Sequence, residues 1–241
     1  GFGGRRGTRR HMLEADFTKY FEEVSWLRNT RHGYEAELYT DLGNDVVNTQ
    51  QTFNLASLSF ESQELLSLAV SHFTDRPIEN FDISDGTLIP SGNYDWWNAK
   101  LSLNTGLYRK LAAANSYTVG GFYDGDRQQI SSKIIYRPTK RISVALNYSL
   151  NLIDWEHFDD SVINLVSGRF QYSFTPDLTL YNLVQYDDIS HSIGLNNRLQ
   201  WEYKPGAKMF LVLNQGYVDG MTGFVISDLE VVAKIGALFR F

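Results

Sequence analysis

The residues best suited to catalysis lie in patterns that do not make an active site. Asp188, His191 and Ser192 occur close together, but neighbours within one loop do not provide the nucleophile–base geometry of a hydrolase. The remaining histidines considered share no metal-ligand spacing with His191: His32, His72 and His157. The chain has no Cys, which excludes thiolate nucleophiles and thiolate metal sites. We therefore expect no enzyme and no cofactor, and keep an outer-membrane hydrolase only as a distant alternative.

Acidic residues gather in the expected connections. Asp124 and Asp126 flank Gly125, and Asp-Gly is a hairpin turn signal. The same carboxylates could also join a calcium site with other loops, although no complete calcium-loop pattern is present. Asp187 and Asp188 lie in a second acidic connection. Such loop charges form either a solvated rim, bridges through divalent cations to anionic lipid, or a vestibule that attracts cations.

A third group of charged residues falls within alternating segments, on the side opposite the apolar residues. Buried charges must pair or contact water, so we expect this group on the inner wall of a barrel. There they tune selectivity if the lumen is open, and form structural ion pairs if it is plugged; the sequence leaves both open. The group comprises Glu35, Glu37, Lys100, Lys133, Arg169, Arg198, Glu202, Lys234 and Arg240.

The elements that must position these residues are strands. In 231–241, apolar residues alternate with Lys234, Gly236 and Arg240, and a period of two is typical of a strand with one apolar side. The same pattern recurs in 142–151. Each run has about 9–11 residues, the length that crosses a bilayer core as a tilted strand. The aromatic end of the chain, Phe239 and Phe241, suits an assembly signal for the barrel-assembly machinery.

Short and long connections alternate in the second half of the chain. The turns at 137–140, 175–177 and 204–206 contain Pro, which presets a turn dihedral. Longer acidic connections separate them, as in bacterial barrels with short periplasmic turns and long outer loops. The pattern predicts about thirteen strands, at 16–27, 32–43, 48–60, 64–76, 92–104, 113–123, 128–137, 141–152, 162–174, 178–187, 194–203, 208–217 and 229–241.

The predicted fold class is all-β: the C-terminal portion of an antiparallel transmembrane β-barrel. Single-chain bacterial barrels have even strand numbers, so we expect at least about fourteen strands in the complete protein, with N-terminal strands missing here. Residues 1–15 are expected to be an unstructured or tag-like start, and residues 16–241 the barrel domain. A soluble β-sandwich or ligand-binding barrel also alternates, but usually keeps its polar residues outside.

The composition of the chain limits the classes of partner that it is expected to bind. The net charge is -6 and charged residues are 21% of the chain, so we expect no nucleic-acid partner. Aromatics are 14% and cluster near expected strand ends, as in the belts of outer-membrane proteins. Trp96 and Trp97 admit a second interpretation, a platform that stacks on sugars. We expect the bacterial outer membrane as the location and its lipid as a partner.

Several strings resemble one family. They are 76–83, 89–94, 121–127, 183–187, 194–201 and 204–214. In this order they resemble the uncharacterised bacterial outer-membrane β-barrel domain found C-terminal to a carbohydrate-binding family-9-like module. The resemblance covers roughly residues 45–241 and implies a barrel whose longer relatives carry an N-terminal sugar-binding-like module. It implies no catalytic residues.

Two functions follow from these observations. The first is a passive or gated conduit for small solutes, with saccharides among the candidate solutes. The second is a membrane anchor that displays a missing N-terminal carbohydrate-binding-like module and transports little. Single-channel conductance would separate the two.

Overall fold

The computed structural model describes residues 7–84, 87–220 and 223–237, and these residues are folded as strands and their connections. The strands are β1 (Thr8–Tyr20), β2 (Leu27–Asp41), β3 (Val46–Phe60), β4 (Leu65–Asp75), β5 (Phe81–Ser84), β6 (Thr87–Ile89), β7 (Tyr94–Asn104), β8 (Leu111–Phe122), β9 (Gly125–Thr139), β10 (Ile142–Trp155), β11 (Ser161–Ser173), β12 (Leu178–Asp187), β13 (Ser192–Lys204), β14 (Ala207–Gly220) and β15 (Gly223–Ala237). The predicted all-β class is confirmed.

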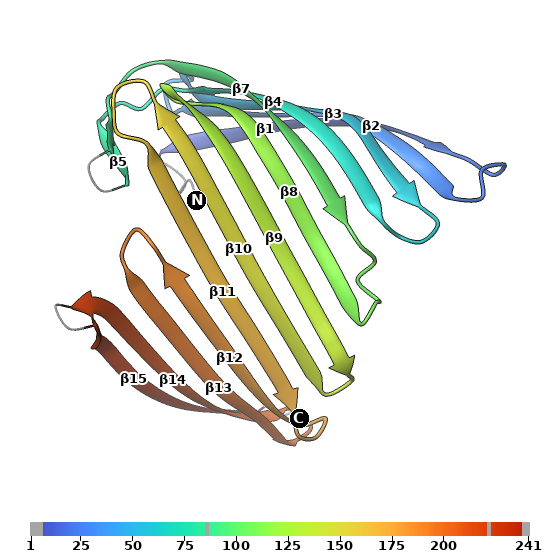
Figure 1. Cartoon of the computed structure of the whole chain (residues 1–241), viewed down its shortest axis with the longest axis vertical. Helices are drawn as coiled ribbons and strands as arrows, with labels where there is room; N and C mark the ends of the chain where they lie inside the picture. The colour runs from blue at the N-terminus through green and yellow to red at the C-terminus, as the bar shows by residue number, and fades with distance from the viewer. Residues whose placement is uncertain (1–6, 85–86, 221–222, 238–241) are drawn as a thin grey trace. The chain divides into compact units, whose positions relative to one another are not determined.

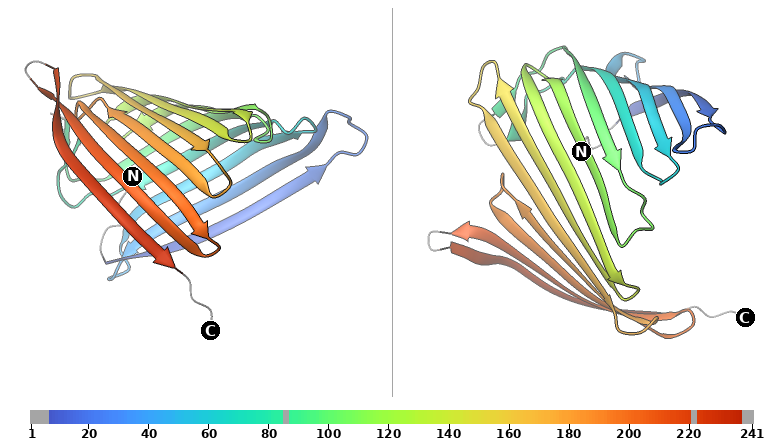
Figure 2. Two further views of the ribbon diagram at one scale, coloured as in Figure 1. Left: turned by 90° about the horizontal axis from the view of Figure 1, so that it is seen from below. Right: turned by 45° about the vertical axis from the view of Figure 1, so that its right-hand side comes forward.

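Thirteen of the strands in the described part of the chain form one antiparallel sheet, in the order β1-β2-β3-β4-β7-β8-β9-β10-β11-β12-β13-β14-β15. Figures 1 and 2 show each strand beside its sequence neighbours, from blue to red. Among the described strands, only those of the short β5–β6 hairpin stand outside this sheet. A continuous antiparallel meander is compatible with a β-barrel, and β1 and β15 are the two ends of the strand order.

The number of sheet strands agrees with the prediction, while the N-terminal boundaries differ. The first strand runs from Thr8 to Tyr20 rather than over 16–27, so residues 8–15, expected to be unstructured or tag-like, lie in β1. They pair with β2 in an unbroken register from Thr8↔Asp41 to Tyr20↔Asn29. The pairing joins charges far apart in sequence, for example Arg10 and Glu37, which the local pattern does not reveal.

The chain divides into two compact units. The first comprises residues 1–106, 114–130 and 151–162, and the second comprises 107–113, 131–150 and 163–241. The boundary crosses strands β8 to β11 part-way along their length.

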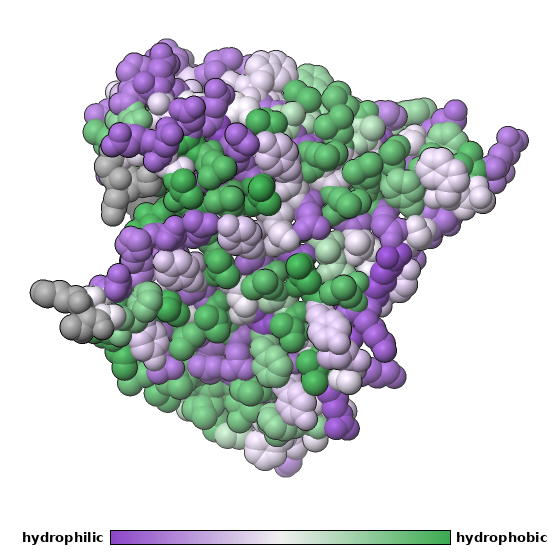
Figure 3. All heavy atoms as spheres, in the orientation of Figure 1, coloured by the Kyte–Doolittle hydropathy of each residue, from purple (hydrophilic) through white to green (hydrophobic). Residues whose placement is uncertain are grey.

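The two faces of the strands differ in residue type and in exposure. On β10, Val144 and Leu146 are 38% and 48% exposed, while their neighbours Ser143 and Asn147 are half-buried. On β9, Ile134 and Tyr136 are likewise exposed. Figure 3 shows hydrophobic atoms spread over the strands on the visible face. This arrangement inverts that of a water-soluble sheet, whose apolar face is the buried one.

Buried apolar side chains are few and concentrate in the first unit. Among the described residues, eight hydrophobic residues are buried, and five of them gather near one end of the first unit's strands: Ile89, Trp96, Tyr123, Ile153 and Trp155. Tyr123 packs 4.9 Å from Trp96 and edge-on to Phe81 of β5, and its hydroxyl donates to the buried Asp75 carboxylate at 2.9 Å. We call this group the aromatic cluster.

Candidate functional site: a basic pocket on the polar face

Strand register places the predicted polar residues on shared faces. Directly opposed residues of antiparallel strands lie on the same face. In the first unit, Glu35 stands opposite Thr52 and Glu37 opposite Gln50, and Lys100 stands opposite Thr118. These positions belong to one polar face. The prediction that they share a side is consistent with the register.

In the second unit, the same reasoning joins strands β11 to β15. Arg169 stands opposite Leu183, and Leu183 opposite Asn196, two residues from Arg198. Glu202 pairs with Lys208, with 3.3 Å between Oε2 and Nζ. Lys234 stands opposite Phe210. Arg240, Phe239 and Phe241 lie outside the described residues.

On the polar face of β1 and β2, arginines form ion pairs with carboxylates. Arg10 forms a salt bridge with Glu37, and Arg10 Nε donates a hydrogen bond to Glu37 Oε2 at 3.2 Å. Arg31 pairs with Asp16 and, at 3.3 Å, with Glu14. Gly33 leaves room for Asp16, because a Cβ at residue 33 would collide with that carboxylate. This region is an ion-pair network between two adjacent strands.

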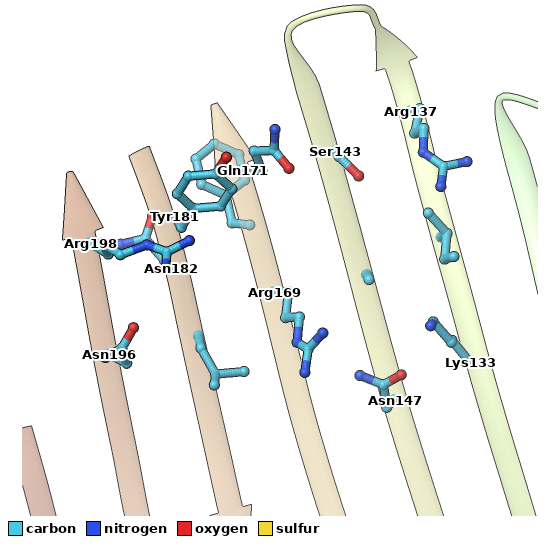
Figure 4. A pocket seen from close by; sticks show the side chains of 14 residues that line it. Lys133, Arg137, Ser143, Asn147, Arg169, Gln171, Tyr181, Asn182, Asn196 and Arg198 are labelled. Atoms are coloured by element: carbon cyan, nitrogen blue, oxygen red, sulfur yellow. The ribbon is translucent and has the colours of Figure 1, made fainter. Parts of the chain in front are cut away.

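The polar face of β9 to β13 instead holds a pocket of about 430 Å³ in which every charge is positive. Lys133, Arg137, Arg169 and Arg198 line it, and none of its 14 lining residues is acidic. Figure 4 shows Lys133, Asn147 and Arg169 at a similar height on β9, β10 and β11. We call this site the basic pocket; all of its lining residues belong to the second unit.

Arg198 is held against an aromatic ring. Its guanidinium carbon lies 4.7 Å from the centroid of Tyr181 on β12, within range of a cation–π contact. Its Nε atom is buried without a hydrogen-bond partner among the described residues. Arg137 donates from Nη1 to the Leu107 carbonyl at 2.9 Å. Lys133 and Arg169 are exposed.

Neutral polar groups surround these cations. Asn147 donates to Ser167 Oγ at 3.0 Å, and Asn196 donates to Asn214, which in turn donates to Glu230 at 2.8 Å. Gln171 and Ser143 also line the pocket. Amide and hydroxyl groups both donate and accept hydrogen bonds, so the wall can bind an anion through its cations and hydroxyl groups through its neutral side chains.

Sequence reasoning selected part of this pocket and missed the rest. The alternation predicts Lys133, Arg169 and Arg198 on the polar wall, whereas Arg137 falls in a predicted Pro turn and Tyr181 carries no signal of its own. Arg137 has the same alternation phase as Lys133, and that signal could have identified it. Tyr181 could not be chosen from its own strand, because its role depends on Arg198 of the neighbouring strand.

The predicted loop carboxylates fall into two separate groups. Asp124 lies in the β8–β9 turn, 3.7 Å from His157 Nδ1, and Asp126 lies on β9. The turn itself is at Tyr123–Asp124, one residue before the expected Asp-Gly pair. Asp187 accepts from the Ile189 backbone N–H at 2.9 Å, which closes the β12–β13 connection. Among the described residues, no group of three or more His, Asp or Glu is placed to hold a metal ion.

Asp188 is fixed by neutral partners in that connection. Its carboxylate accepts from Asn164 Nδ2 at 3.1 Å and from the Tyr186 hydroxyl at 3.1 Å. These hydrogen bonds stabilise the ionised form and lower the pKa of Asp188 below its ordinary value, with Asn164 as the largest cause. Ser192 is engaged with Ser190, at 2.7 Å between the two hydroxyl oxygens.

The two adjacent tryptophans do not form one platform. Trp96 is 8% exposed and belongs to the aromatic cluster, whereas Trp97 is 51% exposed. Trp97 contacts His72, with 4.6 Å between the ring centroids. Consecutive residues of a strand point to opposite faces, so the paired sugar-stacking surface considered from the sequence is not formed.

Comparisons with known proteins add no identification. The scan of protein-family models, the search of curated proteins and the search of solved structures each returned no match. The resemblance described from the sequence motifs stays a prediction. A search of the described residues for helices found none long and apolar enough to cross a membrane.

Proposed function

We propose that these strands belong to a β-barrel in the bacterial outer membrane that acts as a passive or gated conduit for small solutes. The observation that carries the proposal is the exposed apolar face opposite a polar face bearing a basic pocket. Exposed apolar surface of this extent is costly in water and suits contact with lipid. The polar face then provides the wall of a hydrated path.

Aromatic residues at both ends of the apolar face support the membrane setting. Near the short turns of the second unit, Tyr172 contacts Phe174 at 4.7 Å, and Trp201 contacts Tyr203 at 6.0 Å between ring centroids. Near the longer connections, Tyr186 of β12 donates to Asp188 at 3.1 Å. Rings with polar tips favour the headgroup level.

The spacing of these ends fits a bilayer. Phe174 directly follows β11 and has the same alternation phase as Val166, which stands opposite Tyr186. The stretch from Val166 to Phe174 has nine residues. A tilted transmembrane strand needs about 9–11 residues to cross the bilayer core. The outer-membrane lipid and the barrel-assembly machinery are the partners implied by this proposal.

The aromatic cluster favours a second candidate function. In the first unit it occupies the polar face at one end of β4, β7 and β8, where Phe73 stacks on Trp96 at 5.5 Å. Filled polar faces occur in plugged barrels, so the chain would then be a membrane anchor for an N-terminal carbohydrate-binding-like module. That module is inferred from the family resemblance alone.

Planar-bilayer recording tests the conduit. The full chain, refolded and inserted into a lipid bilayer, is expected to give discrete current steps in KCl. The Trp96→Ala variant removes a large side chain from the aromatic cluster. It is expected to raise the conductance if the cluster restricts the path. Folded and inserted protein that carries no current under any voltage would contradict the conduit and favour the anchor.

A further inference from the structure

We propose that the basic pocket binds small hydroxylated organic anions of the sugar-acid class, with the carboxylate at Arg169 and Arg198 and the hydroxyls at the surrounding amides. This inference rests on the proposed function only for its role in transport, because binding can be measured without any current. The conduit would then be selective for this class of solute.

The charge of the pocket favours an anionic ligand. Four cations from β9, β11 and β13 line one 430 Å³ pocket with no acidic side chain among its lining residues. None of the four has a salt bridge with a described residue, in contrast to Arg10 and Arg31. Like charges gathered on one wall repel one another and are stabilised by water or by a bound anion.

The residue types of the cations narrow the chemical class of anion that the pocket would bind. Three of the four are Arg, whose planar guanidinium presents paired donors that match a carboxylate. The Arg198 guanidinium is held by a cation–π contact, 4.7 Å from the centroid of the Tyr181 ring. The buried Nε of Arg198 has no hydrogen-bond partner among the described residues, and a ligand oxygen would remove the cost of this unsatisfied donor.

The neutral lining explains why a hydroxylated anion fits better than a simple one. Gln171, Asn196 and Ser143 lie around the cations in Figure 4, and amides and hydroxyls can both donate to and accept from sugar hydroxyls. Pockets for small molecules are typically about 300–1,000 Å³, so the observed volume accommodates a monosaccharide acid. A site for chloride or acetate would not need this array.

Calorimetric titration of the folded full chain in lipid nanodiscs provides the test. Sodium glucuronate is the probe, with glucose, sodium acetate and inorganic phosphate as comparison solutes. We expect saturable binding of glucuronate, at least about tenfold weaker binding of acetate and of phosphate, and none of glucose in the same range, because charged hydrogen bonds and hydroxyl contacts both contribute. Equal binding of glucose would overturn the role of the cations, and equal binding of acetate or phosphate would overturn the role of the neutral wall.

Two variants and a matched control assign the binding to the pocket. Arg169→Gln and Arg198→Gln should each weaken glucuronate binding by about tenfold or more. Lys140→Gln removes the same charge from the adjacent turn and should leave affinity unchanged. If all three variants weaken binding equally, general charge attraction is responsible and the proposal fails. Should one Arg variant not fold, as judged by heat-modifiable migration, the other decides the question.

Electrical recording then separates this inference from the conduit itself. We expect a reversal potential that favours anions in a KCl gradient and a current blocked by glucuronate but not by glucose. Current without anion preference, together with absent binding, would overturn the inference while leaving the conduit intact. Glucuronate binding without any current would instead contradict the conduit and support the site.

Discussion

The polar faces of β1–β2 and of β9–β13 hold charges in opposite ways. On β1 and β2, arginines and carboxylates alternate across the strand pair, and Arg31 contacts both Asp16 and Glu14. On β9 to β13, Lys133, Arg169 and Arg198 share a pocket with no carboxylate in its lining. The two regions are built from the same kind of strand and differ in whether their cations have carboxylate partners.

The difference distinguishes structural charge from functional charge. A partly exposed ion pair contributes modestly to stability, because solvent screens it, but it leaves no charge available for a solute. Among the described residues, the pocket cations have no carboxylate partner, although Arg137 donates to the Leu107 carbonyl and Arg198 contacts the Tyr181 ring. The comparison therefore assigns stability to the paired region and recognition to the basic pocket.

The largest expected effect tests which face of the strands is apolar and which is polar. The interpretation of both regions depends on that assignment. Leu146→Arg places a charge on the exposed apolar face of β10, and in the proposed bilayer it should cost about 2–4 kcal/mol, whereas Asn147→Arg on the polar face should cost much less. The free energy of unfolding from lipid vesicles measures both. Equal losses for the two variants would refute the assignment of faces.

A smaller effect concerns a matched but uncharged pair between two neighbouring strands. Asn182 of β12 donates to Asn197 of β13, directly opposite. Asn197→Leu alone should cost about 1 kcal/mol, because it leaves the Asn182 amide without that partner. The double variant Asn182→Leu/Asn197→Leu should recover that loss in denaturant titrations. No recovery in the double variant would show that the pair does not act as a unit.

The third prediction compares the two regions directly. Arg31→Gln removes the cation between Asp16 and Glu14 and should lower the denaturant midpoint of the folded protein. Arg169→Gln removes one of four like charges and should leave the midpoint unchanged or raise it. The contrast fails if both variants lower the midpoint equally.

The smallest effect is a pH dependence in the β12–β13 connection. The pKa of Asp188 is lowered in the folded chain by its hydrogen bonds, so its contribution to stability is present above the unfolded pKa, near about 3.9. That contribution is lost as pH falls through the lower folded pKa. Comparing the native chain with Asp188→Asn between pH 7 and pH 3 should show this acid loss only in the native chain. An identical acid profile would remove the claim.

The sequence predicted the strands well because the alternation of apolar and polar residues is local. Residues 142–151 and 196–203 show it directly, and the Pro turns locate the ends of their strands. The start of the chain is harder to predict, because Arg10 and Glu14 pair with residues of β2 that lie far away in the sequence. Local patterning cannot reveal such long-range pairing.

The candidate site shows the same limit. Alternation placed Lys133, Arg169 and Arg198 on a polar side, but no single strand indicates that they share a pocket with Tyr181. That depends on register across β9 to β13, which is set by pairing between strands. Trp96 and Trp97 illustrate the reverse case, because adjacency in sequence suggested a platform that strand geometry prevents.

Site-directed spin labelling of β10 tests the central claim most directly. The chain contains no Cys, so single Cys substitutions at residues 143–148 can each carry one label in the lipid-inserted protein. The account predicts that labels at 144, 146 and 148 are relaxed by oxygen dissolved in lipid, and that labels at 143, 145 and 147 are relaxed by a water-soluble nickel complex. Uniform access of the nickel complex to all six positions would contradict it.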